Sequence, residues 1–174
     1  MSGLVHIYCG EGKGKTTAAL GLIIRALASG YQVVFAQFMK SWDTGELEIL
    51  RGLNHIRVLR GDFPSKFSKD YTLEEREAVY AENNRLFAEA VGKIDPSVQT
   101  LLVLDEINGC LDKKLMDETI VLNYLKNKSM NTEVVLTGRN PLSECVQMAD
   151  YVTEMKNVKH PYDKGIMARK GIEY

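Results

Sequence analysis

Eight residues near the start of the chain have the types and spacing of a phosphate-binding loop. Glycines let the backbone N–H groups of a turn converge on one anion, where larger side chains would crowd it. A lysine adds a point charge, and the hydroxyl after it can bind Mg²⁺. All three features occur in one segment: Gly10, Glu11, Gly12, Lys13, Gly14, Lys15, Thr16 and Thr17.

The flanking sequence favours this interpretation. An apolar run at 4–8 predicts a strand, and 16–29 has a helical pattern whose N-terminus would add positive partial charge. The usual pattern G-x-x-x-x-G-K-[ST] is incomplete, because Cys9 stands where its first glycine belongs and Gly10 follows one place later. The alternative is a glycine-rich turn that caps a helix and binds no ligand.

A second acidic site is predicted in the middle of the chain. The apolar run at 101–104 ends in Asp105 and Glu106, as in a strand that carries Mg²⁺-binding acids to the edge of a sheet. With Thr16, these two acids form the candidate metal site. The alternative for an isolated strand of this kind is a carboxylate that caps a loop.

Three further polar residues follow predicted strands and could contact a nucleotide. Gln37 and Lys40 come at the end of the strand at 32–38, and Arg139 comes after the strand at 133–137. Arginine can grip phosphate oxygens with its planar fork, although either cation could simply be solvated. The three histidines are not spaced as metal ligands.

Strands and helices alternate along the chain, which predicts an α/β fold with a mainly parallel sheet and helices on both faces. Further strands are expected at 55–59 and 151–155. Further helices are expected at 72–92, 116–127 and 142–148, and Thr44 could cap a short helix that runs to Leu53. Thr72 and Glu75 fit a capping box. In such sheets ligands bind at the carboxyl ends of the strands, where all the candidates above fall.

Composition is that of an ordinary globular protein. The 174 residues are 45% hydrophobic and 26% charged, with a net charge of −1, and we expect one domain over 1–174. The charge balance gives no reason to expect nucleic acid as a partner. No run has membrane-spanning length and no signal peptide is evident, so we expect no membrane association. Three cysteines without paired spacing favour reduced thiols and a cytoplasmic location.

Several segments together resemble the ATP:corrinoid adenosyltransferases of the CobA/BtuR type, also called cob(I)yrinic acid a,c-diamide or cob(I)alamin adenosyltransferases. The displaced first glycine is typical of that family. So are the segments 37–40, 104–106 and 137–139, with Trp42 and the Gly45-Glu46 pair. The most specific likeness is the C-terminal segment 158–174, and the resemblance spans essentially the whole chain.

The resemblance implies a RecA-like P-loop fold and transfer of the 5′-deoxyadenosyl group of ATP to cobalt(I), with triphosphate as the leaving group. ATP is then a co-substrate bound with Mg²⁺, and the corrinoid is the substrate. Lys15, Thr16 and Glu106 would be the catalytic residues. Candidates for corrinoid contact are aromatic or lie in the resembling C-terminal segment: Trp42, Phe63, Phe67 and His160.

The resemblance also implies a homodimer and a flavoprotein reductant. Two features depart from the family: its N-terminal extension is missing or very short, and the loop at 60–71 does not align cleanly. The alternative function is a RecA-like P-loop ATPase or kinase that acts on the terminal phosphate. A non-catalytic nucleotide-binding regulator is a third alternative.

Overall fold

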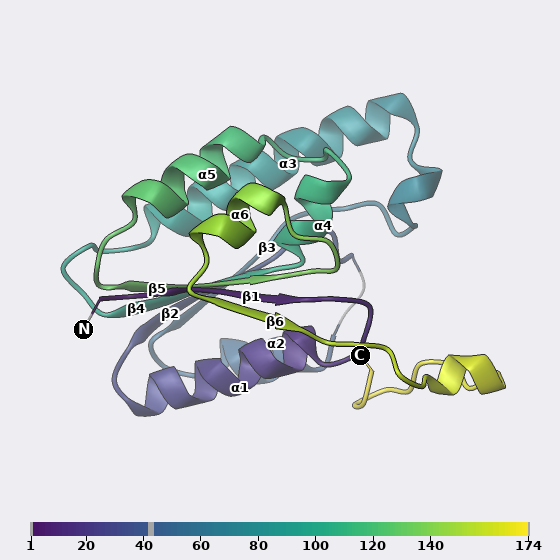
Figure 1. Cartoon of the computed structure of the whole chain (residues 1–174), viewed down its shortest axis with the longest axis horizontal. Coiled ribbons are helices and arrows are strands. Elements are labelled where there is room, and N and C mark those ends of the chain that lie inside the picture. The colour runs from purple at the N-terminus through teal and green to yellow at the C-terminus, as the bar shows by residue number, and fades with distance from the viewer. Residues whose placement is uncertain (1, 42–43, 174) are drawn as a thin grey trace.

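The structure is a computed structural model that describes residues 2–41 and 44–173. A sheet of six parallel strands lies between two helical layers (Figure 1). In the order β3-β2-β4-β5-β1-β6 the strands are Ile56–Arg60, Gln32–Gln37, Thr100–Asp105, Thr132–Thr137, Val5–Cys9 and Tyr151–Glu154. The predicted α/β class is therefore confirmed.

One face of the sheet carries α1 (Lys15–Ala28) and α2 (Glu46–Arg51), and the other face carries the remaining α-helices (Figure 1). Those helices are α3 (Leu73–Gly92), α4 (Ile107–Asp112), α5 (Glu118–Asn127) and α6 (Ser143–Met148). Each face has its own apolar core. Because β2, β4 and β5 are covered on both faces, their residues are almost all buried, as expected for central parallel strands.

Local signals set most of the helix boundaries. Thr72 and Glu75 form the predicted capping box at the start of α3. Asp117 caps α5 by accepting from the N–H of Thr119, so this helix begins slightly later than predicted. The expected cap at Thr44 is wrong. Gly45 precedes α2 without a side-chain bond, and the buried Thr44 hydroxyl has no hydrogen-bond partner.

Three short elements were not predicted. The short helix α4 directly follows Glu106, and a 3₁₀ turn, Ser68–Asp70, interrupts the loop before α3. A second 3₁₀ turn, Pro161–Lys164, lies in the C-terminal segment, which projects from the body of the molecule (Figure 1). Within the described residues, no helix is both long and apolar enough to cross a membrane.

Candidate functional site

The phosphate loop joins β1 to α1 at the carboxyl edge of the sheet. Gly10 and Gly14 have φ of 94° and 118°, which favour glycine, and Gly14 precedes the first residue of α1. Lys15 Nζ donates to the carbonyl oxygens of Gly10 at 2.6 Å and Gly12 at 2.8 Å. Burial lowers the pKa of Lys15, and the Glu106 carboxylate opposes this shift. The ammonium is thus held directly over the loop.

The backbone after β6 supports the loop from outside. The N–H of Gly12 donates to the Met155 carbonyl at 2.6 Å, and a Cβ at Gly10 or Gly12 would lie 2.6 Å from that same oxygen. The N–H of Gly10 donates to the carbonyl of Arg139 at 2.9 Å. These glycines therefore also permit close packing of the backbone, a requirement that the sequence pattern did not reveal.

Asp105 is the most completely bonded side chain of the site. It is fully buried, and four side chains donate to its carboxylate: Thr16 at 2.9 Å, Thr137 at 2.8 Å, Gln37 at 3.2 Å and Lys40 at 2.8 Å. Burial raises the pKa of Asp105, but the Lys40 charge and these hydrogen bonds outweigh it, so the pKa is lowered overall. Asp105 is therefore a fixed anion at the centre of the site.

Glu106 differs from its neighbour in both conformation and electrostatics. Its φ of 67° is unusual for a residue with a side chain, and its N–H donates to Thr137 Oγ1 at 2.9 Å. Burial and the adjacent Asp105 charge raise the pKa of Glu106. Thr137 thus holds both acids. Thr137 was not among the site residues predicted from the sequence. It could have been predicted, because a hydroxyl side chain at the end of the strand next to β4 is well placed to contact both acids.

The oxygens around Asp105 already attract a cation. Lys40 Nζ lies 2.8 Å from Asp105 Oδ2 and 3.4 Å from Thr16 Oγ1. Hard oxygen donors of this kind suit Mg²⁺, which keeps several of its own waters and needs few protein ligands. Within the described residues no group of three or more His, Cys, Asp or Glu side chains could hold a metal. The donor set therefore fits Mg²⁺ only with the Thr16 hydroxyl, waters or substrate oxygens completing the shell.

The other nucleotide candidates lie around this centre. Gln37 also donates to Glu46 at 3.3 Å. Two ion pairs lie at the surface of the phosphate loop. Arg139 pairs with Glu11 of the loop at 2.9 Å. Lys13 of the loop pairs with Glu173 of the C-terminal segment at 3.2 Å. Thr17 is exposed on α1.

A pocket of about 660 Å³ opens beside these groups. Lys40, Glu106 and Arg139 line it, as do Phe67 and Tyr71, which flank the 3₁₀ turn. The other lining residues are Glu11, Met39, Lys66, Ser68, Lys69, Gly109, Asp112, Lys113 and Asn140. The structure thus brings Phe67 to the site, although the loop at 60–71 could not be aligned by sequence.

Two other aromatic candidates lie elsewhere. Phe63 is only 5% exposed and packs in the core, so its selection by residue type alone is not supported by its position. His160 accepts from the N–H of Tyr162 and caps the second 3₁₀ turn instead of lining the pocket. Trp42 lies outside the described residues.

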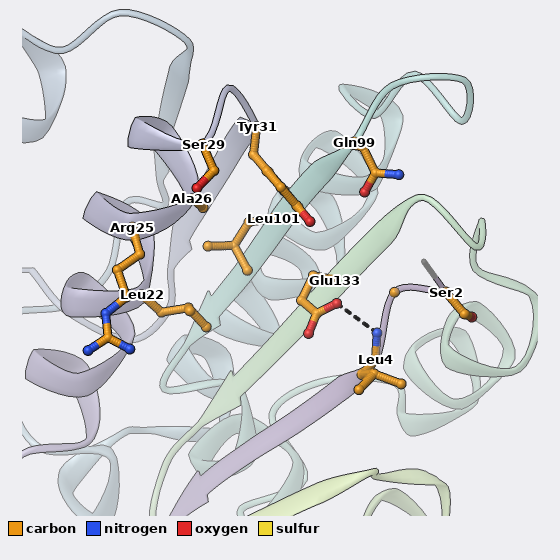
Figure 2. Close-up of a pocket in the computed structure, with 11 residues that line it drawn as sticks. Ser2, Leu4, Leu22, Arg25, Ala26, Ser29, Tyr31, Gln99, Leu101 and Glu133 are labelled. Atoms are coloured by element: carbon orange, nitrogen blue, oxygen red, sulfur yellow. Dashed lines mark hydrogen bonds between the residues drawn. The ribbon is translucent and has the colours of Figure 1, made fainter.

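A second pocket, of about 320 Å³, lies at the opposite edge of the sheet. Figure 2 shows Leu22 of α1 and Leu101 of β4 within it, close to Tyr31 and Glu133. Both carboxylate oxygens of Glu133 are engaged, one by the N–H of Leu4 at 2.8 Å and the other by His6 Nε2 at 2.5 Å. The acid of this pocket therefore has structural partners, and we assign the pocket no ligand.

The loop geometry and the parallel sheet place the protein in the class of phosphate-loop α/β proteins. Comparison with known families narrows that class. Residues 1–174 match the family model ATP:corrinoid adenosyltransferase BtuR/CobO/CobP, and the chain belongs to this family. Adenosylation of corrinoids by ATP is the known reaction of the family. The resemblance found in the sequence is thereby confirmed, and the ATPase or kinase alternative is not favoured.

Individual relatives agree with the family match. The chain is 33% identical to a corrinoid adenosyltransferase of Sinorhizobium sp., over 99% of this chain and 80% of the relative. It is 30% identical to the corrinoid adenosyltransferase CobA of Salmonella typhimurium, over 99% of this chain and 86% of the relative. Among solved structures, the cytoplasmic domain of EssC shares the fold, with a TM-score of 0.58 at 15% identity. That match covers 97% of this chain and about a third (34%) of the other.

Proposed function

We propose that this protein transfers the 5′-deoxyadenosyl group of ATP to the cobalt(I) centre of a corrinoid. The match of the family model to residues 1–174 is the observation that carries the proposal. In this reaction cobalt(I) donates an electron pair to the 5′ carbon of ATP. The carbon–oxygen bond to the triphosphate breaks, and cobalt becomes formally cobalt(III).

The phosphate loop is proposed to hold the departing triphosphate. Lys15 already contacts two loop carbonyls, and Lys40 and Arg139 line the adjoining pocket. Fixed positive groups that face a leaving group of growing negative charge stabilise the transition state. The remaining loop residues named from the sequence, from Gly10 to Thr17, would contribute backbone N–H groups and shape.

Mg²⁺ is proposed to bind beside Thr16, Asp105 and Glu106, and when bound it would neutralise part of the triphosphate charge. Asp105 is fully buried and accepts four hydrogen bonds, whereas Glu106 lines the pocket. This difference supports a direct role for Glu106 and an orienting role for Asp105, which fixes the Thr16 hydroxyl.

The corrinoid is proposed to occupy the pocket beside Glu106, between the sheet edge and the 3₁₀ segment. Met39, Phe67 and Tyr71 give that pocket apolar surface, which suits a flat macrocycle. The cobalt nucleophile carries no proton, so the protein needs no general base. Its contribution is to align cobalt with the 5′ carbon and to exclude competing reactions.

Further parts of the proposal concern the wider assembly. The protein would act as one domain with a RecA-like fold. The order of strands in the sheet, in which β5 lies between β1 and β4, supports this fold. It would form a homodimer and receive electrons from a flavoprotein reductant. The buried free cysteines Cys9, Cys110 and Cys145 suit a reducing compartment such as the cytoplasm.

The decisive experiment is incubation with MgATP and chemically reduced cob(I)alamin, followed by identification of the phosphate product. Tripolyphosphate that appears only when corrinoid is present supports the proposal. ADP or free phosphate formed without corrinoid would instead indicate an ATPase, and binding of ATP without turnover would indicate a regulator.

A further inference from the structure

The side chain of Glu106 folds back onto the first turn of α4. Its backbone is held in the left-handed region, with φ of 67°, and its N–H is fixed by Thr137. Its carbonyl oxygen accepts from the N–H of Gly109 at 3.1 Å and from the N–H of Cys110 at 3.4 Å. The backbone of Glu106 therefore has little freedom, and the carboxylate position depends on what lies beside its side chain.

The space beside the Glu106 side chain is open because residue 109 is a glycine. A Cβ at Gly109 would lie 2.6 Å from Glu106 Oε1, a separation that no real pair of such atoms tolerates. The next atoms that this Cβ would meet are Cδ at 3.4 Å and Cγ at 3.5 Å of the same glutamate. The carboxylate of Glu106 thus lies where any larger residue at 109 would place its first side-chain carbon.

The helix itself has little room to move aside. The turn after β5 packs against the start of α4, so that a Cβ at Gly138 would lie 2.9 Å from the nitrogen of Gly109. The atom that a Cβ at position 109 would meet first is Glu106 Oε1, which is the end of a flexible side chain and not part of the backbone. An added Cβ would therefore displace the Glu106 carboxylate and leave the fold in place.

We propose that Gly109 is a positioning residue for the metal site, because its missing side chain allows the Glu106 carboxylate to lie where it can hold a divalent cation. This inference rests on the proposed role of Glu106 in the reaction. It predicts that Gly109→Ala is harmful to cation binding yet harmless to stability. Alanine is also favoured over glycine inside a helix, which would offset any small loss of packing.

The test compares Gly109→Ala with Gly21→Ala. Gly21 lies inside α1, and a Cβ there would meet no atom within 4 Å, so it reports the general effect of adding alanine to a helix. The affinity of the ATP-bound protein for Mn²⁺ is measured by electron paramagnetic resonance, along with the affinity for metal-free ATP and the Tm. We expect Gly109→Ala to lower Mn²⁺ affinity about 10- to 100-fold, the range seen when the support of a metal ligand is removed.

The same variant should keep its affinity for metal-free ATP within about two-fold and its Tm at or above that of the wild type. Gly21→Ala should keep its Mn²⁺ affinity. Adding Gly109→Ala to Glu106→Gln should cause no further loss, because the carboxylate through which Gly109 acts is already gone.

Normal Mn²⁺ affinity in Gly109→Ala, an additive loss in the double variant, or a clear fall in Tm would each overturn the inference. Glu106→Gln separates this failure from failure of the proposed function. If that single variant binds Mn²⁺ normally, Glu106 is not a ligand, and the proposed metal site is wrong as well.

Discussion

Asp105 and Glu106 are neighbours in the chain whose pKa values are shifted in opposite directions. Asp105 is stabilised as an anion by Lys40 and three other donors, so its contribution to stability is lost only as the pH falls below its usual titration range. Glu106 has a raised pKa, so the folded protein retains its proton in a window above pH 4.5 where the unfolded chain has lost it. Stability therefore falls as pH rises through that window.

Glu106→Gln should accordingly stabilise the ligand-free protein at neutral pH. We expect its Tm at pH 7 to rise, because glutamine carries no charge that burial and the Asp105 carboxylate would oppose. The difference should disappear near pH 4, where both states of the wild type hold the proton. Thermal scans at the two pH values measure this. A variant less stable than the wild type at pH 7 would mean that ionised Glu106 stabilises the fold.

Lys15→Ala should remove a charge that the proposed reaction needs at the leaving group. We expect kcat for adenosylation to fall by about 10²-fold or more, the scale seen when one preorganised electrostatic group is deleted. Lys126→Ala, at the end of α5, is a control for loss of a lysine away from the site. Near-normal turnover of Lys15→Ala would show that the loop does not hold the triphosphate.

The 3₁₀ turn Ser68–Asp70 and the residues that flank it supply part of the pocket lining. Phe67 is 70% exposed, and its ring lies 5.9 Å from the Lys69 ammonium. Phe67→Ala should raise KM for the corrinoid several-fold, since truncation of an aromatic contact commonly costs about 1 kcal/mol or more. ATP affinity and Tm should stay unchanged.

The exposed Leu73 gives a matched control, because it is 76% exposed and does not line the pocket. Leu73→Ala should leave both substrates unaffected. An equal loss of ATP affinity in Phe67→Ala would contradict a corrinoid-specific role. Phe63→Ala should instead destabilise the protein by about 3–5 kcal/mol, as expected for a buried aromatic side chain.

Elements with a strong periodic pattern could be predicted from the sequence. The strands that bring the phosphate loop, Asp105 and Thr137 to one edge are mainly apolar, with His6 and Glu133 among the exceptions. Their parallel arrangement follows from the helices between them. Helix α4 could not be predicted, because six residues show no reliable period and Gly109 is a poor helix former. Its role depends on the fold, which brings Gly138 against its first turn.

Side-chain partners were harder to predict than strand positions. The sequence pairs Thr16 with the two acids, but it does not show that Lys40 bridges Thr16 and Asp105, because that contact depends on the path of the loop after β2. Phe63 and Phe67 are in the same loop and are equivalent by residue type. Their exposure distinguishes them, because Phe63 is buried and Phe67 is exposed.

In the molecule as a whole, many of the exposed large apolar side chains belong to β6 and the C-terminal segment. All four residues of β6 are exposed, including Tyr151 and Val152. Beyond it, Val158 is 84% exposed and Met167 is 70% exposed. Exposed apolar side chains concentrated in one stretch of the chain favour an interaction site there. We propose that a second copy of the chain covers these residues in the homodimer.

Val158→Glu combined with Met167→Glu should therefore shift the protein from dimer to monomer, because buried unpaired carboxylates oppose association. Sedimentation velocity at several protein concentrations measures the change. Met130→Glu is a matched control, since Met130 is 72% exposed but lies before β5. A monomeric wild type, or a variant that remains dimeric, would argue against this surface as the interface.

The position of β1 in the sheet has a consequence for how the protein is made. This strand carries the phosphate loop and is the first of the six strands to be synthesised, yet within the described part of the chain it pairs with β5 and β6, which come last. The Val5 N–H bonds to Asp150, 145 residues away along the chain. Contacts between such distant residues form slowly, because the loop between them must close, at a cost in chain entropy, before the contact stabilises the chain. The nucleotide site of a nascent chain therefore needs β5 and β6 as well as β1, so ATP binding would report that synthesis has passed Glu154.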